Sequence, residues 1–508
     1  MRAVQISRHG GPEELVLGEH PDPVPGPGEV LDGKWAAPMA EHSYDLVVVG
    51  AGSGNMLPDS VLAGRRVAVV EAGLFGGTCL NRGCIPSKML VYTADVAQTI
   101  RDAAAFGIDA SVGTADWPAI RDRVFSHIDT IPGKAVAYRQ RSGVDVYHGQ
   151  ARFTGPRELR VGGDTLRAEH IVLATGSRPM IPDVPGLAGV PYLTSDNVMR
   201  LAELPESLAI LGGGFIAAEM GHVFSSLGVT VTVLERGPAM LSRHDKDIAT
   251  AFTTAFGQQV DLRLNTTVQR VAADGDGVRL DLLTPDGPQP VTAATLLVAT
   301  GRRPNSDLLD LPAAGISTDE HGHVQTDDRL QTKVPGVWAL GDLANHFQLK
   351  HMANAEARVV WHNIVHPDQP REARFPVVPA AVFSDPQVAA AGATEQELIA
   401  SGRPYLAATR RYGGTAYGWA LQDTTSFVKV LADPVTRLLL GAHLIGPQAS
   451  ILIQPLVQAM CLGSTIDDVA TGVLYIHPAL TEVVEQALLG LGVEDDTAMP
   501  VKIKAAED

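Results

Sequence analysis

Two pairs of short, strongly apolar runs, each joined to glycines, set the predicted architecture of the chain. The first pair is YDLVVVGAGSGN (residues 44–55) and RRVAVVEAG (65–73); the second is LAILGGGFIAAE (208–219) and VTVTVLERG (229–237). Runs this apolar suit parallel strands that are buried on both faces of a sheet, and the glycines suit a turn from strand to helix. The pattern therefore predicts an α/β chain with two Rossmann-like dinucleotide-binding units.

Weaker patterns occupy the remainder of the chain. IVLATG (171–176) and LLVATGRRPN (296–305) each predict a strand that ends in a glycine turn. Beyond Phe375, AAVFSDPQVAAAG, SFVKVLAD and LLLGAHLIG are candidate strands, and ILIQPLVQAMCLG has the apolar face of a helix. These elements predict a third unit of mixed α and β structure. By contrast, the proline- and glycine-rich HPDPVPGPGEV (20–30) favours extended or irregular chain, to which we assign no function.

Length, charge and cysteine content narrow the function classes. A chain of 508 residues exceeds one ordinary core, and its net charge of −17 argues against a nucleic-acid surface. No stretch of about 18 uncharged apolar residues is present, and the N-terminus lacks the apolar core of a signal peptide, so we expect no membrane partner. Only 3 cysteines argue against a disulfide framework, and a reducing compartment, the cytoplasm, is expected.

The first glycine turn, GAGSGN at residues 50–55, has the features of a phosphate site. Gly50 and Gly52 suit a tight turn that phosphates can approach closely, and Ser53 and Gly54 complete the predicted site. A helix is expected to follow and to direct its N-terminus at a pyrophosphate.

Two further residues refine this prediction. Asn55 departs from the pattern, because a third glycine normally stands there. Glu71, at the end of the second strand, is placed to bind the adenosine ribose. Strand, glycines and acid together still predict a dinucleotide site.

The second turn, GGGFIA at residues 212–217, fits the pattern Gly-x-Gly-x-x-Ala. Gly212, Gly214 and Ala217 occupy its defining positions, and Glu235 closes the next strand. Two such turns in one chain predict two dinucleotides, such as a flavin and a nicotinamide.

Cys79 and Cys84 lie close together in GGTCLNRGCIPSK (76–88), near the expected start of a helix. Lys88 follows one helical turn after Cys84, and both helix N-termini and nearby cations lower thiol pKa values. The alternatives are two buried cysteines or half of a zinc site, but Cys461 is isolated and no further ligands complete such a site. We therefore predict a redox-active pair beside a flavin, and no metal.

Two carboxylates and a histidine complete the candidate chemistry. Asp342 ends GVWALGD (336–342), where it is placed to bind flavin ribityl hydroxyls. In YIHPALTE (475–482), Glu482 follows His477 closely enough to fix the imidazole tautomer and raise its basicity. The cysteine chemistry needs such an acid–base partner.

Together these motifs resemble those of the class I pyridine nucleotide–disulfide oxidoreductases. GGTCLNRGCIPSK is the most specific of them, and ATG, ATGRRPN, ALGD and HPALTE follow in the family's order from about Tyr44 to Gly492. The resemblance implies a homodimer that uses FAD and a nicotinamide dinucleotide to reduce a small-molecule disulfide. It also implies an N-terminal extension (1–42), a two-part FAD domain (43–190 and 302–374), an inserted NAD(P) domain (191–301), an α+β dimerisation domain (375–492) and a tail (493–508).

The resemblance also implies roles for the catalytic residues. Cys84 is the flavin-side sulfur that forms the charge-transfer thiolate, and Cys79 attacks the substrate disulfide. His477 of the partner subunit moves the proton, and Glu482 orients that imidazole.

Further positions carry over by resemblance. Lys88 and Glu219 would flank the flavin on its nicotinamide side. The additional cofactor-binding positions are Gly77, Thr78, Ala151, Thr175, Gly176, Arg236, Gly301, Gly341, Met352 and Ala353.

Finer features favour one branch of the family, but alternatives stay open. TAYGWALQDT and GAHLIGPQASILIQPLVQAM resemble the branch that reduces the disulfide of a low-molecular-weight thiol. CLNRGCIPSK fits equally well the branch that oxidises dihydrolipoamide with NAD. A non-catalytic flavoprotein subunit is the remote alternative, since it predicts loss of a cysteine, the histidine or the acid.

The nicotinamide preference is predicted from opposing charges. The Glu235 carboxylate suits the ribose hydroxyls of NADH, whereas Arg236 and Arg243 suit the 2′-phosphate of NADPH. We expect NADPH to be preferred, with NADH possible.

Overall fold

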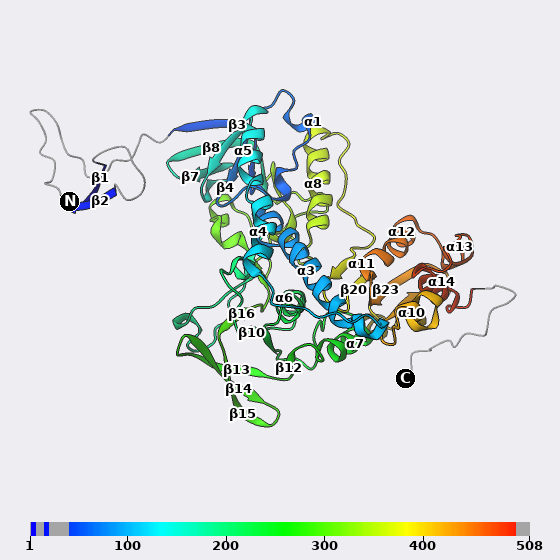
Figure 1. Cartoon of the computed structure of the whole chain (residues 1–508). Coiled ribbons are helices and arrows are strands. Elements are labelled where there is room, and N and C mark those ends of the chain that lie inside the picture. Colours follow the sequence, from blue (N-terminus) through cyan, green and yellow to red (C-terminus); the bar gives the residue numbers. More distant parts are fainter. Residues whose placement is uncertain (1, 7–14, 20–39, 494–508) are drawn as a thin grey trace, which may run out of the picture.

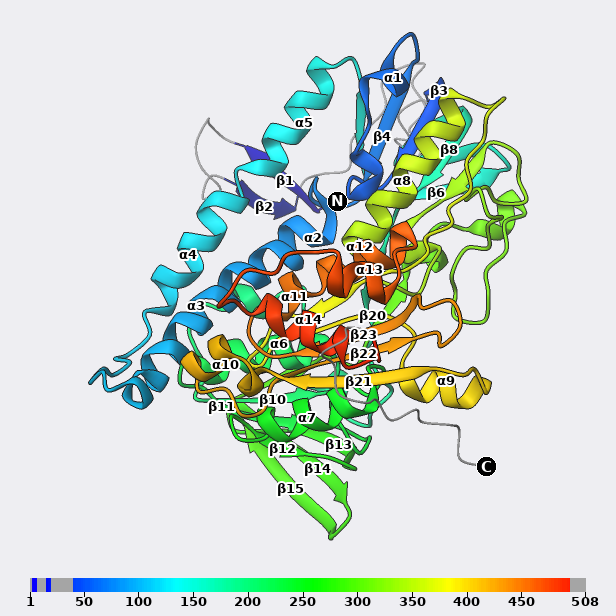
Figure 2. The same cartoon turned by 90° about the vertical axis from the view of Figure 1, so that its right-hand side faces the viewer.

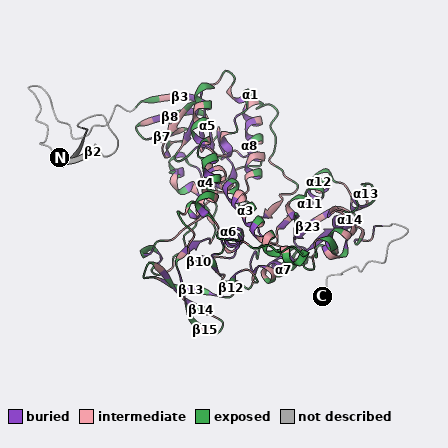
Figure 3. Cartoon of the chain, in the orientation of Figure 1, coloured by how far each residue is buried: buried purple, intermediate pink, exposed green. Residues whose placement is uncertain are grey.

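The apolar runs become the central strands of three sheets, one in each of three units that a computed structural model places side by side (Figure 1). The structure describes residues 2–6, 15–19 and 40–493. Buried residues follow the strands and the inner helix faces of each unit (Figure 3). Each unit thus has apolar side chains of its own to bury, as a domain core requires.

The first unit is built on a seven-stranded sheet of order β5-β4-β3-β8-β7-β6, with β18 beside β8. Strands β5, β4, β3, β8 and β18 are parallel, whereas β7 and β6 are antiparallel additions. Apolar side chains pack on both faces, which explains the near-continuous apolar runs. The strands are Glu41–Val49 (β3), Val67–Glu71 (β4), Asp145–His148 (β5), Ala151–Gly155 (β6), Glu158–Val161 (β7), Asp164–Leu173 (β8) and Val337–Ala339 (β18).

Helices of this unit cover the sheet and lead to its neighbours. Val360, Trp361 and Ile364 of α8 pack on the face that carries Val48 and Val69. Helix α3 runs from this unit towards the C-terminal unit (Figure 1). The helices are Asp59–Leu62 (α1), Gly77–Arg82 (α2), Cys84–Asp102 (α3), Trp117–Ile128 (α4), Ile131–Arg141 (α5) and Lys350–Val365 (α8).

The second unit has a four-stranded parallel sheet of order β12-β11-β10-β16 and an antiparallel sheet of β13, β14 and β15. The short strands β9 and β17 pair where the chain passes between the first two units. The elements are Ser177–Pro179 (β9), Ser207–Leu211 (β10), Phe215–Ser226 (α6), Thr230–Leu234 (β11), Lys246–Phe256 (α7), Asp261–Arg263 (β12), Thr267–Asp274 (β13), Gly277–Thr284 (β14), Gly287–Ala293 (β15), Thr295–Val298 (β16) and Arg302–Pro304 (β17).

The C-terminal unit has a five-stranded antiparallel sheet of order β19-β20-β23-β22-β21, with helices on it (Figure 2). The helix predicted at 451–463 is divided into α11 and α12, with Pro455 in the first turn of α12. The elements are Ala380–Val382 (β19), Val388–Gly392 (β20), Glu395–Ser401 (α9), Leu406–Arg411 (β21), Ala416–Ala420 (α10), Phe427–Ala432 (β22), Leu439–Ile445 (β23), Ala449–Leu452 (α11), Gln454–Leu462 (α12), Ile466–Thr471 (α13) and Thr481–Leu489 (α14). The predicted α/β fold class, with two Rossmann-like units and an α+β C-terminal unit, is confirmed.

A buried cluster of charges joins the second unit to the C-terminal unit. The Lys429 Nζ on β22 donates to Asp245, Asp247 and Glu395, each at 2.7 Å. Lys429 is 3% exposed and Asp245 is 0% exposed. Because the acids belong to the start of α7 and to α9, the ammonium holds three elements together.

The N-terminal segment contributes an antiparallel hairpin of β1 (Arg2–Ile6) and β2 (Leu15–Glu19). The proline-rich stretch 20–30, predicted to be extended or irregular, lies outside the described residues. Over the described ranges, no helix combines the length and apolarity needed to cross a bilayer.

Candidate active site

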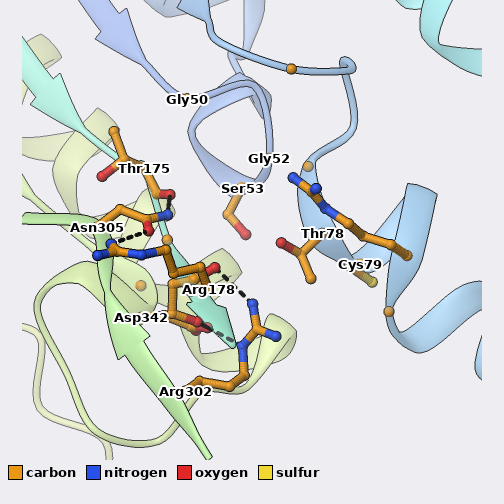
Figure 4. Close-up of a pocket in the computed structure, with 18 of the residues that line it drawn as sticks. Gly50, Gly52, Ser53, Thr78, Cys79, Thr175, Arg178, Arg302, Asn305 and Asp342 are labelled. Carbon is orange, nitrogen blue, oxygen red and sulfur yellow. Dashed lines mark hydrogen bonds between the residues drawn. The ribbon is translucent and has the colours of Figure 1, made fainter. Parts of the chain in front are cut away.

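A cavity of about 620 Å³ opens where the strand ends of the first unit face α3 and α6. The described residues that line it all lie between Val49 and Ala353, so none of those belongs to the C-terminal unit. Figure 4 shows the glycine turn on one side, Thr78 and Cys79 on another, and Arg302 and Asp342 opposite. The cavity therefore gathers motifs from distant parts of the sequence: Gly50 and Asp342 are 292 residues apart.

The first glycine turn makes part of this cavity wall. Gly50 has φ +107°, and a Cβ there would lie 2.3 Å from the carbonyl oxygen of Ala174. Gly77 meets the turn from the other side, where an added Cβ would lie 2.8 Å from the Cα of Gly52. Two stretches of bare backbone therefore approach each other closely, which fits a cradle for phosphate groups.

The helix expected after this turn is interrupted. Ser53–Asn55 form a short 3-10 turn, the chain straightens through Pro58, and α1 then spans only Asp59–Leu62. Pro58 lacks an amide hydrogen and disfavours helical conformation in the residue before it, so a continuous helix cannot form. In place of the expected helix, only a single 3-10 turn begins after Gly52, and the α-helix starts at Asp59.

Asn55, the residue that replaces the third glycine, is bound by a buried arginine. The Arg139 Nε of α5 donates to the Asn55 Oδ1 at 2.8 Å, and its Nη2 donates to the Asn55 carbonyl oxygen. Arg139 is buried. The Asn55 side chain thus adds a bond between the turn and α5 that a glycine, which has no side chain, could not make.

Glu71 stands at the end of β4, as predicted. Its carboxylate accepts from the backbone N–H of Ala51 at 2.7 Å and of Gly73 at 2.8 Å. The acid therefore braces the first turn while it lines the cavity.

The second glycine turn lies between β10 and α6, and here the helix begins directly, at Phe215. Glu235 follows β11 and accepts from the Gly237 N–H at 2.6 Å. Its carboxylate packs against the turn, since a Cβ on Gly213 would meet it at 2.6 Å. Arg236 and Arg243 are both exposed. The arrangement fits a second dinucleotide, outside the cavity wall.

The cysteine pair spans the break between two helices. Cys79 belongs to α2, and Cys84 is the first residue of α3, a helix of 19 residues. Both cysteines line the cavity. At the first position of a helix, Cys84 lies at the positive end of the helix dipole, which favours a thiolate.

The two thiols differ in acidity. The hydrogen bond with Cys84, together with burial, raises the pKa of Cys79. The hydrogen bond from Cys79 lowers the pKa of Cys84 to about 6; the Lys88 charge adds to this effect, while burial opposes it. At neutral pH the shared proton therefore stays on Cys79, and Cys84 is a thiolate.

Lys88 and Glu219 form an ion pair at 2.6 Å between α3 and α6. The Glu219 side chain is 5% exposed, and its carboxylate also accepts from the Phe383 N–H. Lys88 lies over the Phe383 ring, 4.7 Å from its centre. The pair thus sits where all three units meet, next to Cys84.

Asp342 belongs to a chain of buried polar contacts. Its Oδ2 accepts from the Ser177 hydroxyl at 2.7 Å, and that hydroxyl accepts from the Arg302 Nε at 2.9 Å. The Gly341 N–H donates to Glu356 of α8 at 2.6 Å, and burial raises the pKa of Glu356 to about 7. These contacts hold the Asp342 carboxylate at the cavity wall.

His477 and Glu482 are paired but stand apart from the cavity. The His477 Nδ1 and the Glu482 Oε1 are 2.7 Å apart, and this hydrogen bond holds the pKa of Glu482 below its usual value. The His477 side chain is 72% exposed. Among the lining residues that the structure describes there is no histidine. The cavity of one chain therefore lacks an obvious base for Cys79.

The predicted site residues divide into two groups. Those lining the cavity are Gly50, Gly52, Ser53, Glu71, Gly77, Thr78, Cys79, Cys84, Lys88, Ala151, Thr175, Gly176, Glu219, Gly341, Asp342 and Ala353. Those outside its lining are Gly54, Gly212, Gly214, Ala217, Glu235, Arg236, Gly301, Met352, His477 and Glu482.

Sequence reasoning missed several lining residues. Lys350, Arg302 and Ser177 all face the cavity, and Glu356 supports it from behind. Arg302 lies in the ATGRRPN stretch, which the sequence identifies as a family motif. Lys350 gave one signal: a basic residue at the start of a helix opposes the helix dipole.

Comparison with known proteins gives a consistent family. Residues 44–357 match the pyridine nucleotide-disulphide oxidoreductases, and residues 378–488 match the dimerisation domain of that family. A mycothione reductase of Mycobacterium tuberculosis is 46% identical over 462 residues, which cover 89% of this chain and 100% of that protein.

Other relatives match at lower identity. A dihydrolipoyl dehydrogenase of Halobacterium salinarum is 34% identical, over 87% of this chain and 95% of that protein. A mercuric reductase of Streptomyces lividans is also 34% identical, over 87% and 94% respectively. The solved structure of the HOCl-induced flavoprotein disulfide reductase of Escherichia coli superposes with a TM-score of 0.78 and 29% identity, over 88% of this chain and 99% of that one.

Proposed function

Because the chain belongs to the pyridine nucleotide-disulphide oxidoreductases, we propose that it is an NAD(P)H-dependent disulfide reductase that converts mycothione to mycothiol. The family is FAD-dependent and uses a nicotinamide dinucleotide. The observation that carries the proposal is the placement of Cys79 and Cys84 together in the dinucleotide cavity, at the break between α2 and α3, and the lowered pKa of Cys84 supports it. The 46% identity to a mycothione reductase supports the substrate.

The proposal assigns one dinucleotide to each Rossmann-like unit. FAD would occupy the cavity of the two-part domain (43–190 and 302–374), with its phosphates at Gly50 and Gly52, its adenosine ribose at Glu71 and its ribityl hydroxyls at Asp342. The nicotinamide dinucleotide would bind the domain of residues 191–301. The glycine cradle and the two strand-end acids support this assignment.

Disulfide exchange then follows from the two sulfurs. FAD, when bound, would carry the electron pair of the reduced nicotinamide to the Cys79–Cys84 disulfide. His477 of the partner subunit takes the proton from Cys79, and the Cys79 thiolate attacks one mycothione sulfur. A mixed disulfide forms, and the first mycothiol leaves with the proton returned by the imidazole. The Cys84 thiolate then attacks the Cys79 sulfur and restores the disulfide, and the second mycothiol leaves as a thiolate that takes a proton from water.

A homodimer would bring the missing base to the cavity. His477 is exposed, and its neighbours Leu474 and Ile476 are 99% and 74% exposed, as expected for apolar residues that a second subunit covers. The dimerisation domain at residues 378–488 supports the same assembly. Scarcity of cysteine supports the expected cytoplasmic compartment.

Oxidation of dihydrolipoamide with NAD is the second candidate function. It is favoured by Glu235 at the end of β11 and by the 34% identity to a dihydrolipoyl dehydrogenase.

Steady-state kinetics of the purified, FAD-loaded enzyme test the proposal. Mycothione, glutathione disulfide and lipoamide would each be assayed with NADPH and with NADH. The expected result is the highest kcat/KM for mycothione, with no turnover by Cys84→Ser or Cys79→Ser variants. A higher kcat/KM for lipoamide would establish the second candidate, and turnover by both serine variants would exclude the cysteine pair.

A further inference from the structure

Cationic side chains on the cavity wall differ in how their charge is balanced. Among the described residues, five line the cavity, and four of these lie beside a carboxylate. The pairs are Arg82–Asp196 at 3.3 Å, Lys88–Glu219 at 2.6 Å, Arg178–Asp307 at 2.7 Å and Arg302–Asp196 at 3.9 Å. Among the residues that the structure describes, no carboxylate oxygen lies within 4.0 Å of the Lys350 Nζ. The Lys350 ammonium is therefore the unbalanced charge of the cavity.

Lys350 is held over the first glycine turn. Its Nζ donates to the Ser53 Oγ at 3.0 Å, and the Ser53 Oγ in turn donates to the Asn354 Oδ1 at 3.0 Å. Lys350 and Asn354 stand one helical turn apart on α8, so both reach the same serine. The hydroxyl groups of Ser53 and Thr78 are directed into the same space (Figure 4).

The position of Lys350 on its helix makes the positive charge harder to tolerate. Lys350 is the first residue of α8, whose first turn contains no acidic residue and whose N-cap side chain makes no capping bond. A cation at this end adds to the positive end of the helix dipole, whereas an anion there would be stabilised. Lys350 is half-buried, and no described anionic side chain balances its ammonium. An anionic ligand would therefore be stabilised beside it.

The interrupted helix after the first glycine turn explains where that anion belongs. Only the 3-10 turn of Ser53–Asn55 follows Gly52, and α1 is four residues long, so little helix dipole is available for a phosphate. At the second glycine turn, by contrast, α6 begins at once and runs for 12 residues. The helix after the first glycine turn therefore supplies less positive dipole charge to a phosphate than α6 supplies at the second turn. Lys350 is held at the first turn, where this charge is lacking.

We propose that Lys350 binds the diphosphate of FAD, with its ammonium substituting for the helix dipole that the first glycine turn lacks. The inference rests on the proposed function, which assigns FAD to this cavity. An ammonium held by a serine hydroxyl can donate to a phosphate oxygen, and such charge-assisted bonds are the stronger kind. Lys350 is thereby a cofactor-binding residue.

FAD affinity of matched variants tests this proposal. Lys350→Met removes the charge, Lys350→Arg keeps it, and Lys134→Met is the control. Lys134 is an exposed lysine outside the cavity whose Nζ also donates only to a hydroxyl, that of Thr130 at 3.4 Å. The dissociation constant would be measured by diluting each holoenzyme and following the fluorescence of released FAD, at low and high salt. Far-UV circular dichroism would verify that each variant is folded.

We expect Lys350→Met to weaken FAD binding about 10- to 100-fold, the range of a lost charge-assisted hydrogen bond. Its FAD affinity should also depend less on salt than that of the wild type. Lys350→Arg should recover most of the affinity, and Lys134→Met should match the wild type. A folded Lys350→Met with wild-type FAD affinity would overturn the inference.

A second measurement separates the competing role of the ammonium. Lys350 also lies close enough to Cys79 to favour its thiolate. If Lys350→Met instead shifts the pH profile of Cys79 alkylation upwards while FAD affinity is unchanged, the charge serves the sulfur and the inference is wrong. A wild-type chain that binds no FAD at all would refute the proposed function itself, so the two failures are distinguishable.

Discussion

At the Cys84 sulfur, several opposed effects decide one protonation state. Burial favours the neutral thiol, and the nearby Glu219 carboxylate does the same. The hydrogen bond from Cys79 outweighs both, and the Lys88 ammonium adds to it, so the pKa falls to about 6. The proton therefore remains on Cys79, the sulfur that under the proposed mechanism must lose it to attack a substrate.

The first prediction follows from this value. A pKa lowered to about 6 means that the Cys84 thiolate exists above that pH and is lost as pH falls through it. In the reduced holoenzyme, a long-wavelength absorbance from this thiolate against the flavin should persist at pH 7 and fade with a midpoint near 6. Lys88→Met should move the midpoint upwards, and Lys134→Met should not. A wild-type midpoint near the ordinary thiol value would contradict the assignment.

The second prediction concerns the choice between nicotinamides. The Glu235 carboxylate is engaged by the Gly237 N–H, whereas Arg236 and Arg243 are exposed. We expect NADPH preference, because two guanidinium groups outweigh one engaged carboxylate. Arg236→Ala should raise KM for NADPH roughly tenfold and hardly change KM for NADH, and Glu235→Ala should widen the preference. Steady-state kinetics measure both; a higher wild-type kcat/KM with NADH would show that Glu235 dominates.

Individual residues were predictable where a motif is local. The cysteine pair and the first glycine turn were predicted from the residue spacing within each motif, and the structure brings both into one cavity. Lys350 and Arg302 were not predictable in this way, because their roles depend on which side chains they meet across the fold. A lysine at the start of a helix looks like any solvated charge until Ser53 is seen 3.0 Å away.

Among the elements, the two glycine turns diverge although their sequences look alike. Both follow a buried strand, and both were expected to lead into a helix. The second does so at Phe215, but Pro58 interrupts the first, and Arg139 binds Asn55 instead. Periodicity alone misses this difference, since the apolar pattern continues through the interruption.

The third prediction concerns the elements joined by Lys429. Lys429→Met would leave Asp245, which is 0% exposed, buried without its main partner. Breaking a buried ion pair in this way typically costs about 3–5 kcal/mol of unfolding free energy. Urea unfolding should show this loss. The control Lys246→Met, which changes an exposed lysine at the start of α7 beside Asp245, should show almost none. An unchanged midpoint would mean that the charge cluster adds nothing to stability.

For the whole molecule, the order of the three units could be predicted from the sequence, but the way in which they contact one another could not. The two strand–glycine patterns and the late antiparallel strands gave the fold class, because buried strands carry their environment in their composition. Within residues 40–493, the cavity is lined without any residue of the C-terminal unit, and this depends on long-range packing. No pattern of residue spacing in the sequence predicts which units line the cavity.

The fourth prediction tests whether His477 acts across a dimer. Cys79→Ser and His477→Ala chains, each inactive alone, would be coexpressed with different tags and the mixed dimer isolated. If His477 acts on the partner subunit, one of the two sites in the mixed dimer is intact, and about half of the wild-type activity per dimer should return. If each histidine serves its own chain, both sites stay defective. Activity no greater than that of either parent would refute the cross-subunit role.

The absence of C-terminal residues from the cavity wall has a consequence for how the protein is made. The described lining residues, and helix α8 that supports them, have all been synthesised once the chain reaches Val365, whereas the contacts of Phe383 with Lys88 and Glu219 are added later. We therefore expect a nascent chain to bind its flavin before the C-terminal unit has folded and before it meets a second chain. Cofactor supply and subunit encounter would then be separate events in time, each open to its own control in the cell.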